Sequence, residues 1–231
     1  MFIMAVVTSP TLPFETVKRH ELSRALESAT SLQNPIPSSN VEAIDHNRYL
    51  VVSPYDELPH LLDLETLDTT NQLLSRALLE MKCLREDYAT APYIDTFNWP
   101  EIIDTLRQLA RTSNYTWKEQ SFYIVAFRSL VPPSTVQRYS DLGALDKAAH
   151  AEATESGGFL KYWFGVPDQN GRNLATCVWR SLQDARIGSV GAAHRVAANA
   201  ARHMYTEWNI ERLRLLIKDD VEGWEIQPWV D

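Results

Sequence analysis

One stretch, residues 157–218, most constrains what this chain can fold into, because its pattern of apolar residues changes period along it. Apolar side chains first alternate with a period of two, which indicates β-strands, and Asp168, Asn170 and Gly171 between two such runs indicate a hairpin turn. An Ala-rich run then takes up the helical period before alternation returns. The pattern predicts strands at 159–166, 174–180 and 210–218 and a long helix at 192–208.

Two further elements precede this stretch. Residues 122–129 are nearly all apolar, as in a strand that is covered on both faces. Residues 142–156 form an Ala-rich helical pattern that ends at Gly157 and Gly158. The order strand, helix, strand, strand, helix, strand predicts an α+β protein with a ferredoxin-like βαββαβ core, one antiparallel sheet with its helices on one face.

The chain before this core is expected to form an extension. Residues 1–60 are rich in proline and polar residues, and we expect an extended, partly disordered N-terminal arm there. Residues 61–118 contain two amphipathic helical patterns, which predict a helical layer packed on the ferredoxin-like domain at 119–231. The open face of such a sheet needs a cover, and either this helical layer or a second subunit can provide it.

Local signals add detail to two of these elements. Ser181 followed by Asp184 is typical of a helix N-terminus directly after the second hairpin strand. Alternation in the first hairpin strand predicts which side chains share a face. One face is expected to carry Leu160, Tyr162 and Phe164, and the other Phe159, Lys161, Trp163 and Gly165.

Charge and cysteine content exclude several classes of partner. The net charge of -8 argues against a surface for nucleic acid or anionic membranes. Cys83 and Cys177 are too widely spaced for a zinc motif, and a reducing compartment fits them best. The apolar start of the chain is too short for a membrane span and has no basic residues ahead of it. We therefore expect a cytoplasmic protein without nucleic-acid or membrane partners.

The sequence also lacks the motifs of nucleotide and metal enzymes. It contains no Gly-rich phosphate loop, no Gly-x-Ser-x-Gly nucleophile motif and no His-Glu-x-x-His zinc motif. We therefore expect no cofactor and no metal.

Four stretches are long and specific enough to indicate a family. On them the chain, from about Leu62 to Asp231, resembles a fungal family of uncharacterised UPF-series proteins. The resemblance implies a fungal origin and brings no established reaction with it. The stretches are DYATAPYIDTFNW (87–99), LGALDKAAHAEATESGGFLKYWFG (142–165), GRNLATCVWRS (171–181) and MYTEWNIERLRL (204–215).

The order of elements in residues 122–218 also resembles the dimeric α+β barrel superfamily. That group includes cofactor-independent monooxygenases of antibiotic biosynthesis, haem-degrading monooxygenases and small cyclases. In the haem-degrading and quinone-forming members, a strand Trp, a helix His and an Asn on the first strand line the cleft. Trp179 and His194 are possible matches for the first two, whereas the first strand here contains no Asn.

Two histidines are the candidate catalytic residues, because histidine titrates near neutrality. His150 lies beside the apolar stripe of its helix, either as a general base or as a surface residue near Asp146 one turn earlier. His194 lies on the apolar side of the long helix and His203 on the opposite side. His194 is either a site residue or bonded to backbone at the helix start. His60, in a loop-like segment, is expected at the surface.

Strand residues complete the candidate site. Lys161 and Arg180 are charges in otherwise apolar strands. They either lie on a solvated face or edge, or anchor a carboxylate, phenolate or carbonyl group of a ligand. The aromatic candidates for substrate binding, which core packing explains equally well, are Tyr162, Trp163, Trp179 and Tyr205.

Together with the fungal origin that the family resemblance implies, these residues favour a small-molecule enzyme of secondary metabolism. We expect cofactor-independent cyclisation, isomerisation or oxygenation of a small apolar or aromatic, oxygenated ligand. His150 or His194 would transfer the proton, and Arg180 or Lys161 would stabilise an oxyanion. The alternative is a non-catalytic ligand-binding or protein-interaction module. A homodimer is a further expectation.

Overall fold

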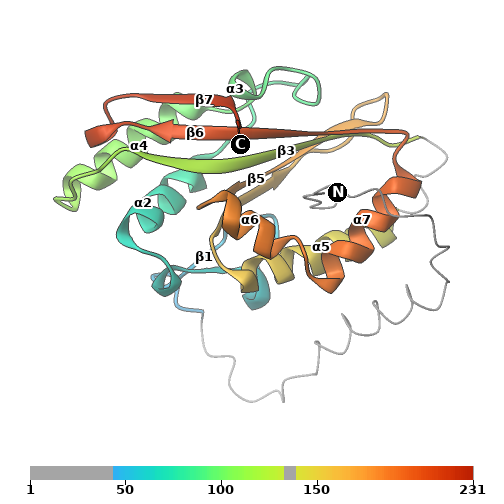
Figure 1. The fold of residues 1–231 in the computed structure, drawn as a ribbon, viewed down its shortest axis with the longest axis horizontal. Helices are drawn as coiled ribbons and strands as arrows, with labels where there is room; N and C mark the ends of the chain where they lie inside the picture. The colour runs from blue at the N-terminus through green and yellow to red at the C-terminus, as the bar shows by residue number, and fades with distance from the viewer. Residues whose placement is uncertain (1–43, 133–138, 231) are drawn as a thin grey trace, which may run out of the picture.

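A five-stranded antiparallel sheet positions the rest of the molecule (Figure 1). The computed structural model describes residues 44–132 and 139–230. All neighbouring strands of the sheet pair antiparallel. In spatial order the strands are β4 (Phe159–Phe164), β5 (Arg172–Trp179), β3 (Gln120–Leu130), β6 (Glu207–Ile217) and β7 (Trp224–Pro228).

The connections confirm the predicted ferredoxin-like fold class. Helix α5 (Tyr139–Ser156) connects β3 to β4, and α6 (Leu182–Gly188) and α7 (Ala192–Met204) connect β5 to β6. The first four strands of the spatial order, β4-β5-β3-β6, therefore follow the ferredoxin-like arrangement, and β7 extends it beyond β6 through the short helix η5 (Asp219–Val221). All three helices lie on the same face of the sheet (Figure 1).

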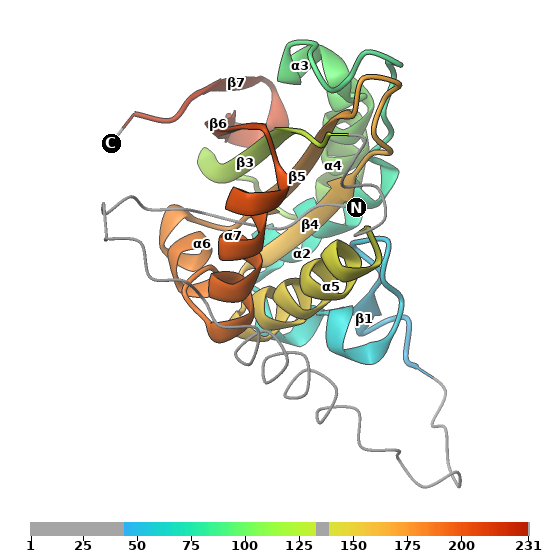
Figure 2. The same cartoon turned by 90° about the vertical axis from the view of Figure 1, so that its right-hand side faces the viewer.

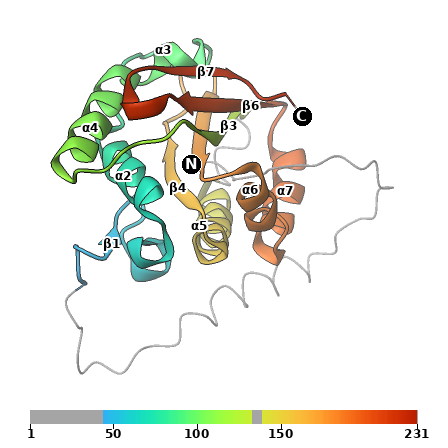
Figure 3. The same cartoon turned by 60° about the vertical axis from the view of Figure 1, so that its left-hand side comes forward.

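The opposite face is covered by the N-terminal helices of the same chain. Figure 3 shows α2 and α4 on one side of the sheet and α5, α6 and α7 on the other. Side chains such as Leu74 and Ile102 from this layer share a buried core with Phe122 and Leu215 from the sheet. Two covers were expected for the open face of the sheet, the helical layer or a second subunit. The structure shows the helical layer there. Its elements are α2 (Thr69–Ala77), η3 (Leu78–Glu80), α3 (Tyr93–Thr96) and α4 (Trp99–Thr112).

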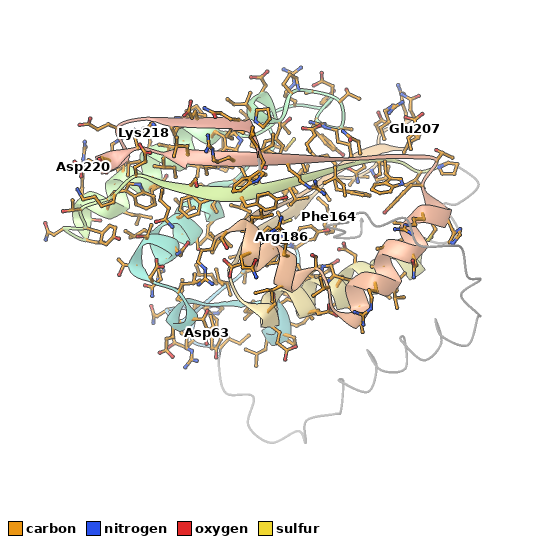
Figure 4. All side chains as sticks on the ribbon, viewed as in Figure 1. Asp63, Phe164, Arg186, Glu207, Lys218 and Asp220 are labelled. Carbon is orange, nitrogen blue, oxygen red and sulfur yellow. The ribbon has the colours of Figure 1, made fainter. Side chains whose placement is uncertain are left out.

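A second core lies between the sheet and α5–α7. Ala149 and Ala153 of α5 are fully buried there together with Tyr123 of β3, and their small side chains permit close packing of the helix on the sheet. Phe164 lies between the sheet and these helices (Figure 4) and packs against the same core. This second core is the one that holds the candidate site.

The segment before the helical layer also lies against the domain. Strand β1 (Tyr49–Leu50) pairs with β2 (Leu62–Asp63), and the short helices η1 (Leu58–His60) and η2 (Leu64–Thr66) flank β2. Figure 2 shows this segment beside α5. We call residues 53–60 the strap, because they cross α5. Residues 1–43 of the predicted arm lie outside the described residues.

Two predicted details of the fold are corrected. A β-bulge between Phe159 and Lys161 shifts the alternation of β4. Phe159 therefore packs with Tyr162 on the α5 face, and Leu160 packs in the core of the other face. Helix α7 ends at Met204, not at residue 208, because β3 extends to Leu130 and pairs there with Glu207.

Candidate functional site

A buried carboxyl group, that of Asp146 on α5, is the centre of the candidate site. Its side chain is 0% exposed. The hydroxyl of Tyr55 donates to Oδ2 at 2.5 Å, and the hydroxyl of Tyr162 donates to Oδ1 at 2.7 Å. Burial raises the pKa of Asp146 to about 7, although both hydrogen bonds act in the opposite direction. This carboxyl group therefore titrates near neutral pH.

One turn further along α5, His150 packs against His60 of the strap. Both side chains are buried, and their Nδ1 atoms lie 3.0 Å apart, so one donates and the other accepts. The rings of Tyr55 and Phe159 each pack edge-on against His150 with centroids 5.1 Å away. Burial lowers the pKa of His150 to about 3, and repulsion from protonated His60 or His194 acts in the same direction, so the ring is neutral.

The other ring nitrogen of His150, Nε2, is not hydrogen-bonded to the described residues. This atom is buried. Buried polar atoms are normally paired, so an unpaired one is available to a ligand. The carboxyl of Asp146 and this nitrogen lie on the same side of α5, because they are four residues apart.

Three contacts hold the strap over this part of α5. Tyr55 bonds to Asp146, Glu57 forms an ion pair with Lys147, and His60 contacts His150. Among the rings at the site, those of Tyr55 and Phe164 are half-buried, whereas Asp146 and His150 have no exposed surface. The partly exposed ring of Tyr55 therefore lies between Oδ2 of Asp146 and the surface of the strap.

His194 belongs to a separate contact between α5 and α7. Its Nδ1 lies 3.3 Å from Oε1 of Glu152, and the backbone N–H of Ala193 donates to Oε2 at 2.7 Å. Burial alone would raise the pKa of Glu152, but these bonds outweigh it and lower the pKa. His194 is buried and His203 exposed, as the helical phase predicts. The partner of the His194 ring is a carboxylate of another helix.

The predicted strand residues divide between the two faces of the sheet. Lys161 pairs in register with Val178, whose side chain belongs to the core under the helical layer. Trp163 lies on the same face, with its ring edge-on to Tyr88 and Phe97 at centroid distances of 5.4 and 5.0 Å. The sheet therefore separates Lys161 and Trp163 from Asp146.

The remaining predicted residues support the fold around the site. Arg180 is bonded to Asp184 through Nε at 3.0 Å and Nη2 at 2.6 Å, at the start of α6. Trp179 is buried and donates through Nε1 to Sγ of Cys177 at 3.0 Å. Tyr205 packs on Phe127 with centroids 5.5 Å apart, where α7 meets β3.

Three residues of the site were not predicted as such: Tyr55, His60 and Asp146. The sequence did contain a signal that Asp146 is buried, because it lies between Leu145 and Ala149 of the buried helical stripe. The predicted alternative of a surface position for His150 is wrong, and so is the surface position expected for His60. The strap residues contact α5 across about 90 positions of sequence, and no local pattern signals that contact.

Neither a metal site nor a membrane span is found in residues 44–132 and 139–230. No group of three or more His, Cys, Asp or Glu side chains in that part of the chain is arranged to hold a metal ion. Among the helices described there, none combines the length and the apolar character that a membrane crossing needs.

Several solved structures are similar to part of the chain. A putative antibiotic biosynthesis monooxygenase from Nitrosomonas europaea is 11% identical with a TM-score of 0.33, covering 47% of this chain and 90% of its own. One from Caulobacter crescentus CB15 is 20% identical with a TM-score of 0.35, covering 41% and 89%. A variant of SnoaB, a cofactor-independent oxygenase from Streptomyces nogalater, is 14% identical with a TM-score of 0.31, covering 39% and 89%.

The sequence itself has a relative in fission yeast. UPF0643 protein PB2B2.08 of Schizosaccharomyces pombe (strain 972 / ATCC 24843) is 35% identical over 214 residues, which cover 90% of this chain and 95% of the relative. A family model described as PB2B2.08-like matches residues 51–228, a range that includes Tyr55, Asp146 and His150. The chain therefore belongs to the PB2B2.08-like family.

Proposed function

We propose that the protein is an enzyme that removes a proton from a carbon next to the carbonyl group of a small apolar or aromatic molecule. The observation that carries this proposal is the fully buried carboxyl of Asp146, which two phenols hold and whose pKa burial raises to about 7. A general base works best when its pKa lies near the operating pH. Among the described residues, no other Asp or Glu combines complete burial with so high a pKa.

The proposed step is an enolisation. The carboxylate of Asp146 takes the proton from carbon, and the electron pair of that C–H bond moves to the carbonyl oxygen as an enolate. In a substrate with a conjugated C=C bond, return of the proton to the far carbon of the dienolate gives isomerisation, and attack of the enolate carbon on a second carbonyl group gives cyclisation. The expected cyclisation and isomerisation therefore share one first step, and an oxygenation would consume O2 as a further co-reactant.

His150 is suited to stabilise the enolate oxygen. When His60 donates through Nδ1 to Nδ1 of His150, the proton of His150 resides on Nε2. That N–H is a buried donor without a partner among the described residues, so a substrate oxygen would satisfy it. A neutral imidazole can serve as the electrophile in such reactions.

The surrounding rings favour an apolar substrate. Phe159 packs on His150, and Phe164 packs on Tyr162 with centroids 5.6 Å apart. Because Asp146 and His150 have no exposed surface, the substrate must displace the ring of Tyr55 and with it part of the strap. Such local opening of a surface segment is common at ligand sites and costs little compared with global unfolding.

The wider setting is also a proposal. We place the protein in fungal secondary metabolism, in the cytoplasm, as an enzyme that needs no cofactor and that forms a homodimer. The division into an arm at 1–60, a helical layer at 61–118 and a domain at 119–231 stays a prediction. The strap, at the end of that arm, would be part of the catalytic unit.

Hydrogen exchange into the substrate tests the proposed function. A small-molecule extract of a fungal strain that lacks the gene is incubated in D2O with the purified protein and searched by mass spectrometry for compounds that gain deuterium. Enolisation labels the substrate carbon even when no net product accumulates. We expect labelling with the wild-type protein and a loss of at least about a hundredfold with Asp146→Asn.

The control is Asp104→Asn, which changes an exposed carboxylate of α4 that pairs with Arg107. This variant should label at the wild-type rate. If Asp146→Asn, folded as judged by circular dichroism, labels the same compounds as fast as the wild type, the proposed role of Asp146 is wrong.

The second candidate is a non-catalytic binding module, and the complete burial of Asp146 and His150 favours it. In that case the two residues only fasten the strap to α5. A compound that co-purifies with the protein, or shifts its melting temperature, without gaining deuterium in D2O would support this alternative.

A further inference from the structure

A lysine on the other face of the sheet has no counter-charge among the described residues. Lys161 on β4 is only 9% exposed, and it points into the layer between the sheet and the N-terminal helices, where its register partner Val178 is buried. Helix α2 and the short helix η3 pack on β4 there. In the part of the chain that the structure describes, no hydrogen bond or ion pair to its amine is found.

In the described part of the chain, Lys161 differs in its lack of a charged partner from Arg180, the other cation that the sequence places in an apolar strand. Arg180 is neutralised by Asp184 through two hydrogen bonds. For Lys161, burial lowers the pKa to about 8, and no carboxylate in residues 44–132 or 139–230 is near enough to raise it. A largely buried lysine without a carboxylate partner is costly, and amines with such strongly lowered pKa values cluster at functional sites.

We infer that Lys161 is a second reactive site, at which its amine condenses with the carbonyl group of a small apolar aldehyde or ketone. The amine lone pair forms a bond to the carbonyl carbon, and the oxygen takes a proton to give a carbinolamine. Loss of the hydroxyl group as water then leaves a C=N bond, so one water is released for each Schiff base. No oxidant or reductant is needed.

A carbonyl compound fits this site better than an anion does. Anion sites converge several donors on one ligand, whereas the face around Lys161 is formed by apolar side chains such as Leu160 and Val178. Apolar surroundings also keep the amine partly neutral, which is the reactive form. At pH 7, the neutral fraction of an amine with a pKa near 8 is about 300-fold that of an ordinary lysine.

Reductive labelling tests this inference. The full-length protein at pH 7 is treated with dilute benzaldehyde and sodium cyanoborohydride, which traps a Schiff base as a stable secondary amine, and the modified lysines are mapped by peptide mass spectrometry. We expect Lys161 to be labelled at least about tenfold faster than Lys82 and Lys218, whose side chains are 65% and 46% exposed. Equal or slower labelling of Lys161 overturns the inference.

Two controls show whether the labelling reports a Schiff base at Lys161. In Lys161→Arg the fast-labelled peptide must disappear while the rest of the map is unchanged. If acetate or inorganic phosphate, added alone, protects Lys161 more strongly than a non-reactive analogue such as benzyl alcohol, the site binds anions and the condensation is wrong.

This site and the function proposed for Asp146 fail separately, because they lie on opposite faces of the sheet. Asp146→Asn should leave the labelling of Lys161 unchanged, and Lys161→Arg should leave the deuterium exchange unchanged.

Discussion

The Nδ1 atoms of His60 and His150 lie 3.0 Å apart inside the protein and join the strap to α5. Only one proton fits between them, so the two rings cannot both be protonated while this contact persists. Burial lowers the pKa of each ring. The contact that closes the strap therefore requires at least one neutral ring, and acid, which protonates both, opposes it.

The first prediction concerns His150→Gln, which removes this titration. The pKa of His150 is about 3 in the folded protein and near 6.5 in the unfolded chain, so its contribution to stability is complete above pH 6.5 and is lost as the pH falls toward 3. We expect the stability difference between wild type and variant to fall by about 1.4 kcal/mol for each pH unit below 6. Urea unfolding at pH 5, 6 and 7 measures it. Parallel curves for the two proteins would contradict the prediction.

Asp146→Asn should show the opposite dependence. The pKa of Asp146 is raised from 3.8 to about 7, so the folded protein holds a proton that the unfolded chain has released. The contribution of Asp146 to the free energy of unfolding is complete below pH 3.8 and is lost as the pH rises to 7. The stability difference between wild type and variant should therefore decrease from pH 5 to pH 7, again by about 1.4 kcal/mol per unit. In the wild type, the effects of Asp146 and His150 on the pH dependence of the unfolding free energy partly cancel. Each dependence is therefore seen only when the other residue is kept and one is replaced.

The two phenols make a third prediction. The hydrogen bonds from Tyr55 and Tyr162 lower the pKa of Asp146, so Tyr55→Phe or Tyr162→Phe should raise it above 7, by roughly one unit. Carboxyl carbon NMR of protein labelled at aspartate follows this titration directly. Tyr93→Phe is the control, because Tyr93 is buried but bonds to Thr176 on the other face of the sheet. An unchanged pKa in both site variants would mean that the phenols do not hold the carboxyl group.

The sequence predicted most of the fold, because local patterns determine its elements. Ser181 caps α6 by accepting a hydrogen bond from the backbone N–H of Asp184, as its spacing indicated. The bulge in β4 was missed, since Phe159 and Leu160 are both apolar and nothing in their identities shows which one turns away. Each predicted strand and helix could be checked against its own period, whereas a bulge depends on the neighbouring strand.

The candidate site was predicted only in part. His150 was named because histidine titrates near neutrality and Tyr162 because it is aromatic, and both lie on elements with a clear period. Tyr55 and His60 lie in a segment without one, and their role depends on contacts with α5 about 90 residues away. Such contacts are a product of tertiary packing and leave no mark in the local sequence.

Lys161→Met is expected to stabilise the protein. The pKa of Lys161 is lowered from 10.5 to about 8, so its charge costs stability as the pH falls from 10.5 to 8, and the full cost applies at neutral pH. Replacing the charge by an apolar side chain of similar length should add about 1–3 kcal/mol at pH 7 and raise the melting temperature by several degrees. The same change at the exposed Lys118 should have no measurable effect. A lower melting temperature for Lys161→Met would show that the amine has a stabilising partner.

Gly191→Ala tests the link between α5 and α7. The backbone of Gly191 has φ -71°, which any residue adopts, so only space matters. A Cβ there would overlap Oε1 of Glu152, and the carboxylate would have to leave its bonds to Ala193 and His194. We expect a loss of about 1–3 kcal/mol in the free energy of unfolding, because a buried imidazole then loses its acceptor.

A double-mutant cycle separates this clash from other effects of the methyl group. Once Glu152→Ala has removed the carboxylate, Gly191→Ala should cost less than about 0.5 kcal/mol, since nothing remains for the Cβ to displace. Urea unfolding of the four proteins at pH 7 gives the coupling energy. If Gly191→Ala costs the same with and without the Glu152 side chain, the glycine is required by α7 itself and not by the contact of Glu152 with His194.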